Sequence, residues 1–168
     1  IPTIVAISAG GQDSLFLDEN GNVYSYGRNT SGQLGHGNVN YYNYPTRIDT
    51  FKALAGNTIT TPNIVAISTG PYHSLFLDKN GKVYGSGRNY NGQLGLSGNS
   101  YNFPTRIDTF KDFDGATIDT PVIITISTGW HHSLFLDNLG KVYSCGNGGY
   151  GQLGHGDTNN CNIPTEIT

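Results

Sequence analysis

Ser-Leu-Phe-Leu-Asp occupies residues 14–18 and recurs unchanged at 74–78 and 133–137. The copies are 60 and 59 residues apart, and two further motifs keep the same period. These motifs are Gly-Gln-Leu-Gly, at 32–35, 92–95 and 151–154, and Pro-Thr-Arg/Glu-Ile, at 45–48, 104–107 and 164–167. A fixed period of this length predicts a repeat architecture, in which one supersecondary unit is copied and stacked.

The period divides the 168 residues into three repeats, which we assign to 2–61, 62–120 and 121–168. The first two repeats end in matching spacers, at 49–61 and 108–120, and the third stops before its spacer. The chain therefore begins and ends in phase with its own period. It contains no methionine, so we expect a processed chain or a segment of something longer.

The composition excludes two classes of partner. Charged residues make up 12% of the chain and the net charge is −3, which speaks against a nucleic-acid surface because such a surface needs clustered Lys and Arg. No apolar run is long enough to span a membrane, and no signal peptide is visible. Solubility must come from uncharged polar residues, a composition that slightly favours an extracellular or cell-surface protein.

The second repeat shows the expected strands. Residues 64–68 and 74–78 have the β-branched and apolar composition of short buried strands. Asn80-Gly81 predicts a tight hairpin in which both central turn residues have positive φ. A third strand begins at 83–84, an Asn- and Gly-rich loop follows it, and 106–107 form a brief fourth strand.

Four short antiparallel strands per repeat predict an all-β fold of three tandem β-propeller blades. We expect Gly92 and Gly95 where the backbone takes positive φ or passes close to a neighbour, with Leu94 as an apolar plug between them. The same structural role is assigned to Gly32, Leu34, Gly35, Gly151, Leu153 and Gly154. A solenoid of stacked β-turns is the structural alternative, and it ranks lower because its coils are usually shorter.

The combined pattern resembles the repeat of the regulator of chromosome condensation family. In the second repeat it reads I-x-x-I-S-x-G-x-x-H-S-L-F-L-D-x-N-G-K-V-Y-x-x-G-R-N-x-x-G-Q-L-G, closed by P-T-R-I, and it covers the chain outside the spacers. The resemblance implies a propeller, typically of seven blades, and a role as nucleotide exchange factor, chromatin binder, scaffold or enzyme inhibitor. The family's usual Trp in the third strand is replaced by Tyr26, Ser86 and Cys145, and its usual His is Asp13 in the first repeat.

Three blades are too few for a closed propeller, which usually has four to eight. Two uncovered end sheets would expose about 600 Å² in total, the upper limit for a soluble monomer. Further blades of the same polypeptide, a two-chain ring of six blades, or an open head-to-tail filament would each cover them. The near-identical repeats favour the last two solutions, because each end resembles an internal junction.

A candidate contact surface lies in the turn before each Ser-Leu-Phe-Leu-Asp strand. This turn differs between repeats while its framework is constant, as expected of a binding surface, and drift in an exposed turn is the alternative. Tyr72, Trp130 and His131 occupy it. Tyrosine contributes a large contact area at low entropic cost, so we add five tyrosines of the loops: Tyr41, Tyr42, Tyr90, Tyr101 and Tyr150.

The histidines are interpreted as structural. His73 and His132 share one repeat position, and we expect each imidazole to hold its own turn by hydrogen bonds rather than to bind a metal, which needs converging ligands. His36 and His155 are interpreted as solvated loop residues. Cys145 and Cys161 occur only in the third repeat, and a disulfide between them and two unrelated thiols are both left open.

We therefore interpret the chain as a non-catalytic module for protein interaction or structural assembly, with no cofactor and no metal. Its expected partner is a protein: copies of itself or further blades of the same polypeptide. A regulator of a small GTPase, implied by the family alone, and a glycan-binding surface protein are the two alternatives. An enzyme ranks last, because no convergent set of acid, base or metal ligands is evident.

Overall fold

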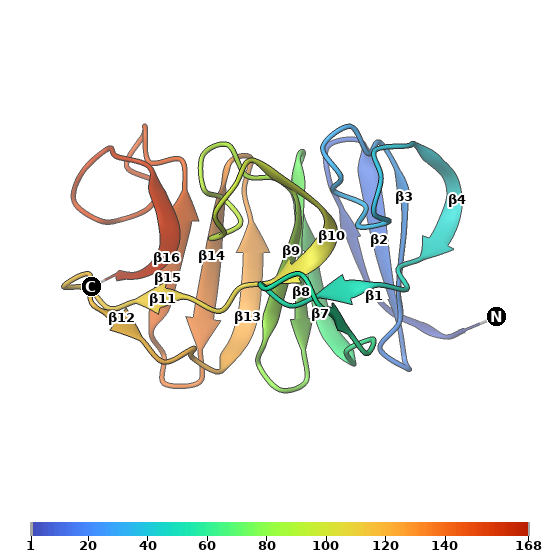
Figure 1. The fold of residues 1–168 in the computed structure, drawn as a ribbon, viewed down its shortest axis with the longest axis horizontal. Helices are drawn as coiled ribbons and strands as arrows, with labels where there is room; N and C mark the ends of the chain where they lie inside the picture. Colours follow the sequence, from blue (N-terminus) through green and yellow to red (C-terminus); the bar gives the residue numbers. More distant parts are fainter. Residues whose placement is uncertain (1, 168) are drawn as a thin grey trace.

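The computed structural model describes residues 2–167, which form sixteen β-strands and no helix. Three sheets lie side by side along the long axis of the molecule, and the N- and C-terminal ends of the chain lie at opposite ends of this row (Figure 1). Within the described range, no helix is long and apolar enough to cross a membrane. The arrangement is the predicted one of three consecutive propeller blades.

Each sheet contains an antiparallel meander of four strands from one repeat. The strands of the first repeat are β1 (Ile4–Ala9), β2 (Asp13–Asp18), β3 (Val23–Gly27) and β4 (Tyr42–Arg47). Those of the second are β7 (Ile64–Thr69), β8 (His73–Asp78), β9 (Val83–Arg88) and β10 (Ser100–Arg106). Those of the third are β13 (Ile123–Thr128), β14 (His132–Asp137), β15 (Val142–Gly146) and β16 (Cys161–Ile167).

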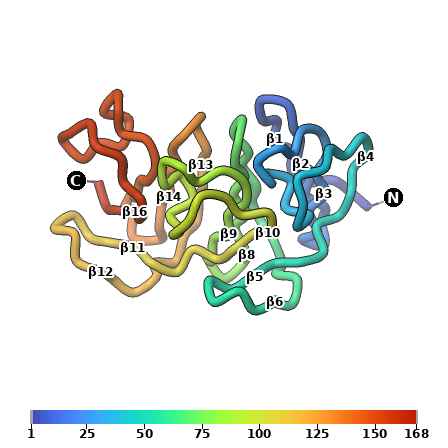
Figure 2. Tube along the Cα trace, turned by 45° about the horizontal axis from the view of Figure 1, so that its top comes forward, coloured from blue at the N-terminus to red at the C-terminus, as the bar shows by residue number. Residues whose placement is uncertain are grey.

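The spacers are the main departure from the predicted four-stranded blade. The first spacer forms the hairpin β5 (Phe51–Lys52) and β6 (Thr58–Ile59), and β5 pairs in parallel with β10. The second forms β11 (Phe110–Lys111) and β12 (Thr117–Ile118), and β11 pairs in parallel with β16. Both hairpins lie along the same edge of the molecule (Figure 2). The second and third sheets therefore have six strands, and each spacer joins the sheet of the repeat that follows it.

The hairpin turn between β8 and β9 differs from the predicted type. Only Gly81 has positive φ, at 76°, and its N–H donates to the backbone oxygen of Asp78 over 3.0 Å. The carboxylate of Asp78 accepts the N–H groups of Asn80 and Lys82 at 2.8 and 3.0 Å. An acidic side chain thus fixes a turn with a single left-handed glycine, and the same contacts recur in the other two repeats.

The fourth strand is longer than its sequence indicates. Strand β10 pairs with β9 at Ser100 and Tyr101, shifts register, and resumes pairing at Thr105 and Arg106. The irregular stretch lies within the segment that the pattern assigned to a loop. A strand interrupted in this way has no continuous alternation of apolar and polar residues, so only its last residues were predicted.

The apolar core lies between the sheets. Leu15, Leu17 and Val23 of the first sheet share one buried cluster with three residues of the second, Ile64, Phe76 and Tyr84. The corresponding residues of the second sheet pack in the same way against the third. Each spacer adds one phenylalanine: the ring of Phe110 lies edge-on to Phe135 and Tyr143, with centroids 5.8 and 5.4 Å away. Blade stability therefore depends on neighbouring blades.

Candidate functional site

The Gly-Gln-Leu-Gly loops are held by hydrogen bonds within each repeat. Leu34 and Leu94 are fully buried and Leu153 is 2% exposed. The N–H of Leu94 donates to Oδ1 of Asn89 over 2.8 Å, and the equivalent bond in the first repeat measures 2.9 Å. The side-chain oxygen of Gln93 closes the turn by accepting the N–H of Asn91 at 3.0 Å.

These loops also form the contact with the following blade. Gly92 has a φ of 81°, and a Cβ at this position would overlap the side chain and Cα of Asn162 in β16. A Cβ at Gly95 would lie 2.5 Å from Cδ of Pro164. Gly32 and Gly35 face Asn102 and Pro104 in the same way. The glycines thus let the loop of one blade lie directly on the fourth strand of the next.

His73 connects the second and third blades. Its Nε2 lies 2.9 Å from Oγ of Ser133, and that hydroxyl donates to the backbone oxygen of Gln93 over 2.7 Å. Because the hydroxyl has one hydrogen, His73 must be the donor at Nε2. Burial lowers the pKa of His73 to about 3, so the ring is neutral at pH 7. The expected bond to its own turn is replaced by a bond between blades.

Asp13 takes the place of His73 at the first junction and reverses the bonding. Its Oδ2 accepts from Oγ1 of Thr69 over 2.7 Å. The Thr69 hydroxyl lies 2.9 Å from Oγ of Ser74, so Ser74 must donate to Thr69. Burial raises the pKa of Asp13 to about 6. A donor position of the repeat has therefore become an acceptor position.

His36 and His155 are half-buried rather than solvated, which corrects their prediction. Nε2 of His36 lies 2.9 Å from Oγ of Ser25, and Nε2 of His155 lies 2.9 Å from Oγ of Ser144. Burial lowers the pKa of His36. Each histidine therefore links its loop to the third strand of its own blade, a contact that sequence spacing alone does not reveal.

The turns before β2, β8 and β14 lie next to one another. Their aromatic side chains form a cluster together with two arginines. The guanidinium carbons of Arg28 and Arg88 lie 5.9 and 5.3 Å from the ring centroid of Tyr72. The ring of His131 is stacked on Tyr72 with an interplanar angle of 4° and a centroid distance of 5.3 Å. Arg88 also lies 4.8 Å from the ring of Tyr90. We call this cluster the Arg–aromatic surface; its members are Arg28, Tyr72, Arg88, Tyr90, Trp130 and His131.

Two family sequence models, both describing the same repeat, match most of the chain. A model described as the regulator of chromosome condensation (RCC1) repeat matches residues 20–77, 80–136 and 140–168. A second model with the same description matches residues 4–33, 64–93 and 123–152. The chain belongs to the RCC1 repeat family. Both models match three times, in agreement with the period of the sequence.

Known proteins that are similar to this chain in sequence are much longer than it. It is 30% identical to the ultraviolet-B receptor UVR8 of Arabidopsis thaliana over 161 residues, which are 96% of this chain and 33% of that protein. It is 33% identical to the protein RCC2 homolog of Xenopus laevis over 151 residues, which are 90% of this chain and 26% of that protein. The chain thus spans a third or less of the length of these relatives.

Solved structures show the same fold. Prp20p of Saccharomyces cerevisiae matches with a TM-score of 0.78 and 24% identity, over 98% of this chain and 38% of that one. Human WBSCR16 matches with a TM-score of 0.76 and 23% identity, also over 98% and 38%. The three sheets are therefore blades of a partial RCC1-type propeller.

The remaining tyrosines of the RCC1 repeats divide into packed and exposed ones. The ring of Tyr42 lies 4.3 Å from that of His36, and the Tyr101 hydroxyl donates to the backbone oxygen of Ser97. Both tyrosines therefore stabilise their loops by contacts within the same repeat. Tyr41 is 63% exposed and Tyr150 is 95% exposed, so both are open to solvent.

The two cysteines are free thiols, which is the second of the alternatives left open by the sequence. Cys145 is fully buried, and its Sγ contacts the backbone oxygen of Gln93 at 3.5 Å. Sγ of Cys161 donates to the backbone oxygen of Ile163 over 3.0 Å. Burial raises the pKa of the Cys145 thiol well above its ordinary value, so this thiol is protonated at pH 7.

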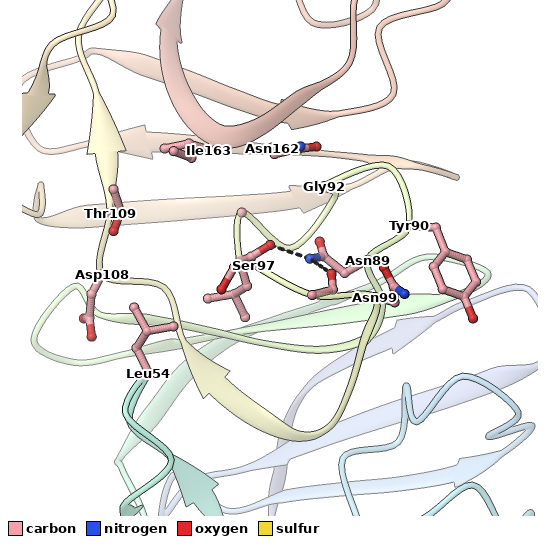
Figure 3. A pocket seen from close by; sticks show the side chains of 13 residues that line it. Leu54, Asn89, Tyr90, Gly92, Ser97, Asn99, Asp108, Thr109, Asn162 and Ile163 are labelled. Carbon is pink, nitrogen blue, oxygen red and sulfur yellow. Dashed lines mark hydrogen bonds between the residues drawn. The ribbon is translucent and has the colours of Figure 1, made fainter.

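A cavity of about 410 Å³ opens between the second and third RCC1 blades (Figure 3). Asn89, Ser97 and Asn99 line it from one side, and Asn162 and Ile163 from the other. At the first junction a Cβ on Gly37 would overlap the ring of Phe103, whose place at the second junction is taken by Ile163. The smaller side chain leaves room. Within residues 2–167, no three His, Cys, Asp or Glu side chains converge as metal ligands.

Proposed function

We propose that this chain is a non-catalytic structural module that assembles end to end with further copies of itself. The observation that supports the proposal is a match between the two outer faces of the row of blades. The outer face of the first sheet and the outer face of the third each carry one half of a junction that is complete twice inside the chain. The match involves both apolar and polar groups.

The first sheet exposes the apolar residues that the other sheets bury. Ile7 is 75% exposed. Its equivalent Ile67 is partly buried and its equivalent Ile126 is 8% exposed, and both pack against the preceding blade. Ile4 is 41% exposed, and its equivalents Ile64 and Ile123 are each 2% exposed. The pattern is what an uncovered inter-blade surface presents.

The third sheet exposes the complementary residues. Leu134, Leu136 and Val142 are half-buried and line an apolar hollow of about 200 Å³ on its outer face. Their equivalents in the second repeat, Leu75, Leu77 and Val83, are 0 to 2% exposed because the third blade covers them. A blade with the surface of the first sheet therefore fits this hollow.

The two outer faces also carry complementary hydrogen-bonding groups. The N–H of Ile123 donates to the backbone oxygen of Gly81 over 3.1 Å, and that of Ile64 to Gly21 over 3.2 Å. By repeat position, Ile4 would donate to Gly140 of a second copy. The bond from His73 to Ser133 has its counterpart in His132 and Ser14. A junction of this kind joins unlike faces, so it generates either a ring or a filament.

One pair of variants tests the assembly. Ile7→Asp places a charge where the junction must be dry, whereas Val5→Asp places it on the opposite side of β1. Val5 is 60% exposed, and its equivalents Val65 and Ile124 remain 51% and 53% exposed in complete junctions. We expect sedimentation velocity to show oligomers for the wild type and Val5→Asp, and monomer for Ile7→Asp. A wild type that stays monomeric at high concentration would refute the proposal.

Two other functions are distinguished by simple assays. Nucleotide exchange on a small GTPase is supported by the family relationship alone, and a nucleotide-release assay tests it. Glycan binding is supported by the cavity of Figure 3, whose walls carry the amides of Asn99 and Asn162. A glycan array would detect it, and Asn99→Ala would then reduce the signal.

A further inference from the structure

Arg88 is held in place by aromatic rings alone. Its guanidinium lies over Tyr72 and Tyr90, and its buried Nε has no hydrogen-bond partner among the residues that the structure describes. The salt bridges found in this range use other cations, namely Arg47, Arg106 and Lys141. A guanidinium has five N–H donors in a fixed plane, so Arg88 is positioned and its charge is left without an anion.

Arg28 is oriented by neutral groups. Its Nε donates to Oγ1 of Thr30 over 2.9 Å, and its Nη1 donates to Oε1 of Gln12 over 3.0 Å. These bonds leave Nη2 available for an external acceptor. The carboxylate of Asp13 interacts with the charge of Arg28, but Asp13 is 4% exposed and its Oδ2 bonds to Thr69, so it is no competitor at the surface.

A hollow beside Arg28 provides the space for a ligand. It measures about 290 Å³ and is bounded by three successive repeats: Gly11, Gln12, Arg28, Pro71, Tyr72 and Trp130. Trp130 is 71% exposed. Aromatic and arginine side chains at such a position are the residue types that dominate the binding energy of protein interfaces.

The charge of this surface is opposite to that of the chain. The pKa of His131 is lowered by burial and by the nearby charge of Arg88, so the imidazole is neutral at pH 7. Arg28 and Arg88 are then the charged groups of the Arg–aromatic surface, on a chain whose net charge is −3. A local positive surface on an acidic protein favours an anionic partner.

We propose that the Arg–aromatic surface binds a short acidic segment of a partner protein, with its carboxylates on Arg28 and Arg88 and its backbone over Tyr72 and Trp130. Arginine recognises a carboxylate through two parallel hydrogen bonds. Two cations suit a segment with two or three acidic residues. A nucleic acid would require a longer track of cations to displace its counterions. All members of this surface belong to a single copy of the chain, so peptide binding does not require end-to-end assembly.

The probe is a fluorescein-labelled ten-residue peptide of alternating Glu and Ser, measured by fluorescence anisotropy at low salt. Arg28→Gln combined with Arg88→Gln should weaken binding at least tenfold. Lys79→Gln combined with Lys82→Gln is the matched control, because it removes the same charge at the opposite end of β8. We expect the control to bind like the wild type, and a Gln-Ser peptide to bind neither protein.

Several results would overturn the proposal. An equal loss of peptide affinity in both double variants would show that binding depends only on the net charge of the protein. Equal binding of the Glu-Ser and Gln-Ser peptides would show that the carboxylates are not read. Tighter binding of a DNA duplex than of the peptide would assign the surface to nucleic acid, and absence of peptide binding by the wild type would remove the site altogether.

Discussion

Nε2 of His73 donates to Oγ of Ser133 at 2.9 Å, and the same hydroxyl donates to the backbone oxygen of Gln93. His73 and Ser133 are 60 residues apart in the sequence and belong to successive blades. These two consecutive hydrogen bonds lead from the second blade into the third and back to a loop of the second. All three groups are buried, so each bond fixes how one blade sits on the other.

His73→Ala should therefore destabilise the protein by about 1–3 kcal/mol, the cost of removing a buried hydrogen-bond partner. Urea denaturation measures the loss. His132→Ala is the matched control, because His132 has the same repeat position but lies half-exposed at the outer face. An equal loss at both positions, measured on monomeric protein, would contradict a role across the junction.

Asp13→His should restore the donor of the repeat and stabilise the protein at pH 7 by about 1 kcal/mol or more. The pKa of Asp13 is raised to about 6, so the unfolded chain ionises first as the pH rises from 3.8. This carboxyl therefore lowers stability between pH 4 and 6, by up to about 3 kcal/mol.

A buried histidine at position 13 would act in the opposite direction, because a lowered pKa costs stability as the pH falls below 6.5. The advantage of Asp13→His should shrink from pH 7 to pH 4. Thermal unfolding at four pH values across this range checks the trend. A difference that does not change with pH would exclude Asp13 as the titrating group.

Gly92→Ala should be more harmful than Gly151→Ala. Both glycines have positive φ, 81° and 74°, so each substitution carries a backbone cost of about 1–2 kcal/mol. At Gly92 the new Cβ also meets Asn162, whereas nothing lies within 4 Å at Gly151. We expect an additional loss of about 1–3 kcal/mol at Gly92, measured by denaturant unfolding of the monomer; equal losses would show that loop strain dominates.

Phe110→Ala should cost about 3–5 kcal/mol, as expected for a large side chain in a core. Phe110 is fully buried against Phe135 and Tyr143. Phe113, in the same spacer, is 53% exposed, and Phe113→Ala should change stability by less than about 1 kcal/mol. Calorimetry on both variants tests whether the spacer belongs to the following blade.

The period and the strand composition were sufficient to predict the blades, because residues 74–78 and their copies are buried wherever the sheet is covered. The spacer hairpins were not predicted. Phe51–Lys52 is two residues long, which is too short for an alternating pattern. Its pairing partner, β10, lies about 50 residues further along the chain, so only the tertiary structure brings them together.

The sequence singled out some members of the Arg–aromatic surface, and their role in binding stays a prediction. Variation between repeats singled out Tyr72, Trp130 and His131, and the structure places all three in one cluster. From the sequence alone, Arg28 and Arg88 resemble loop anchors, because each stands next to an asparagine that does build the loop. Their shared repeat position, next to the variable turn in space, was the sequence feature that could have identified them as part of the surface.

The pairing of β5 with β10 also determines where this gene can be recombined. A cut after residue 61 would separate the hairpin from the sheet that it completes. The pentapeptide Ile-Asp-Thr-Phe-Lys, however, occurs identically at 48–52 and at 107–111, just where one sheet ends and the next begins. Crossover within this shared sequence would delete or duplicate one whole sheet with its own edge strand, and the joint would have the native sequence.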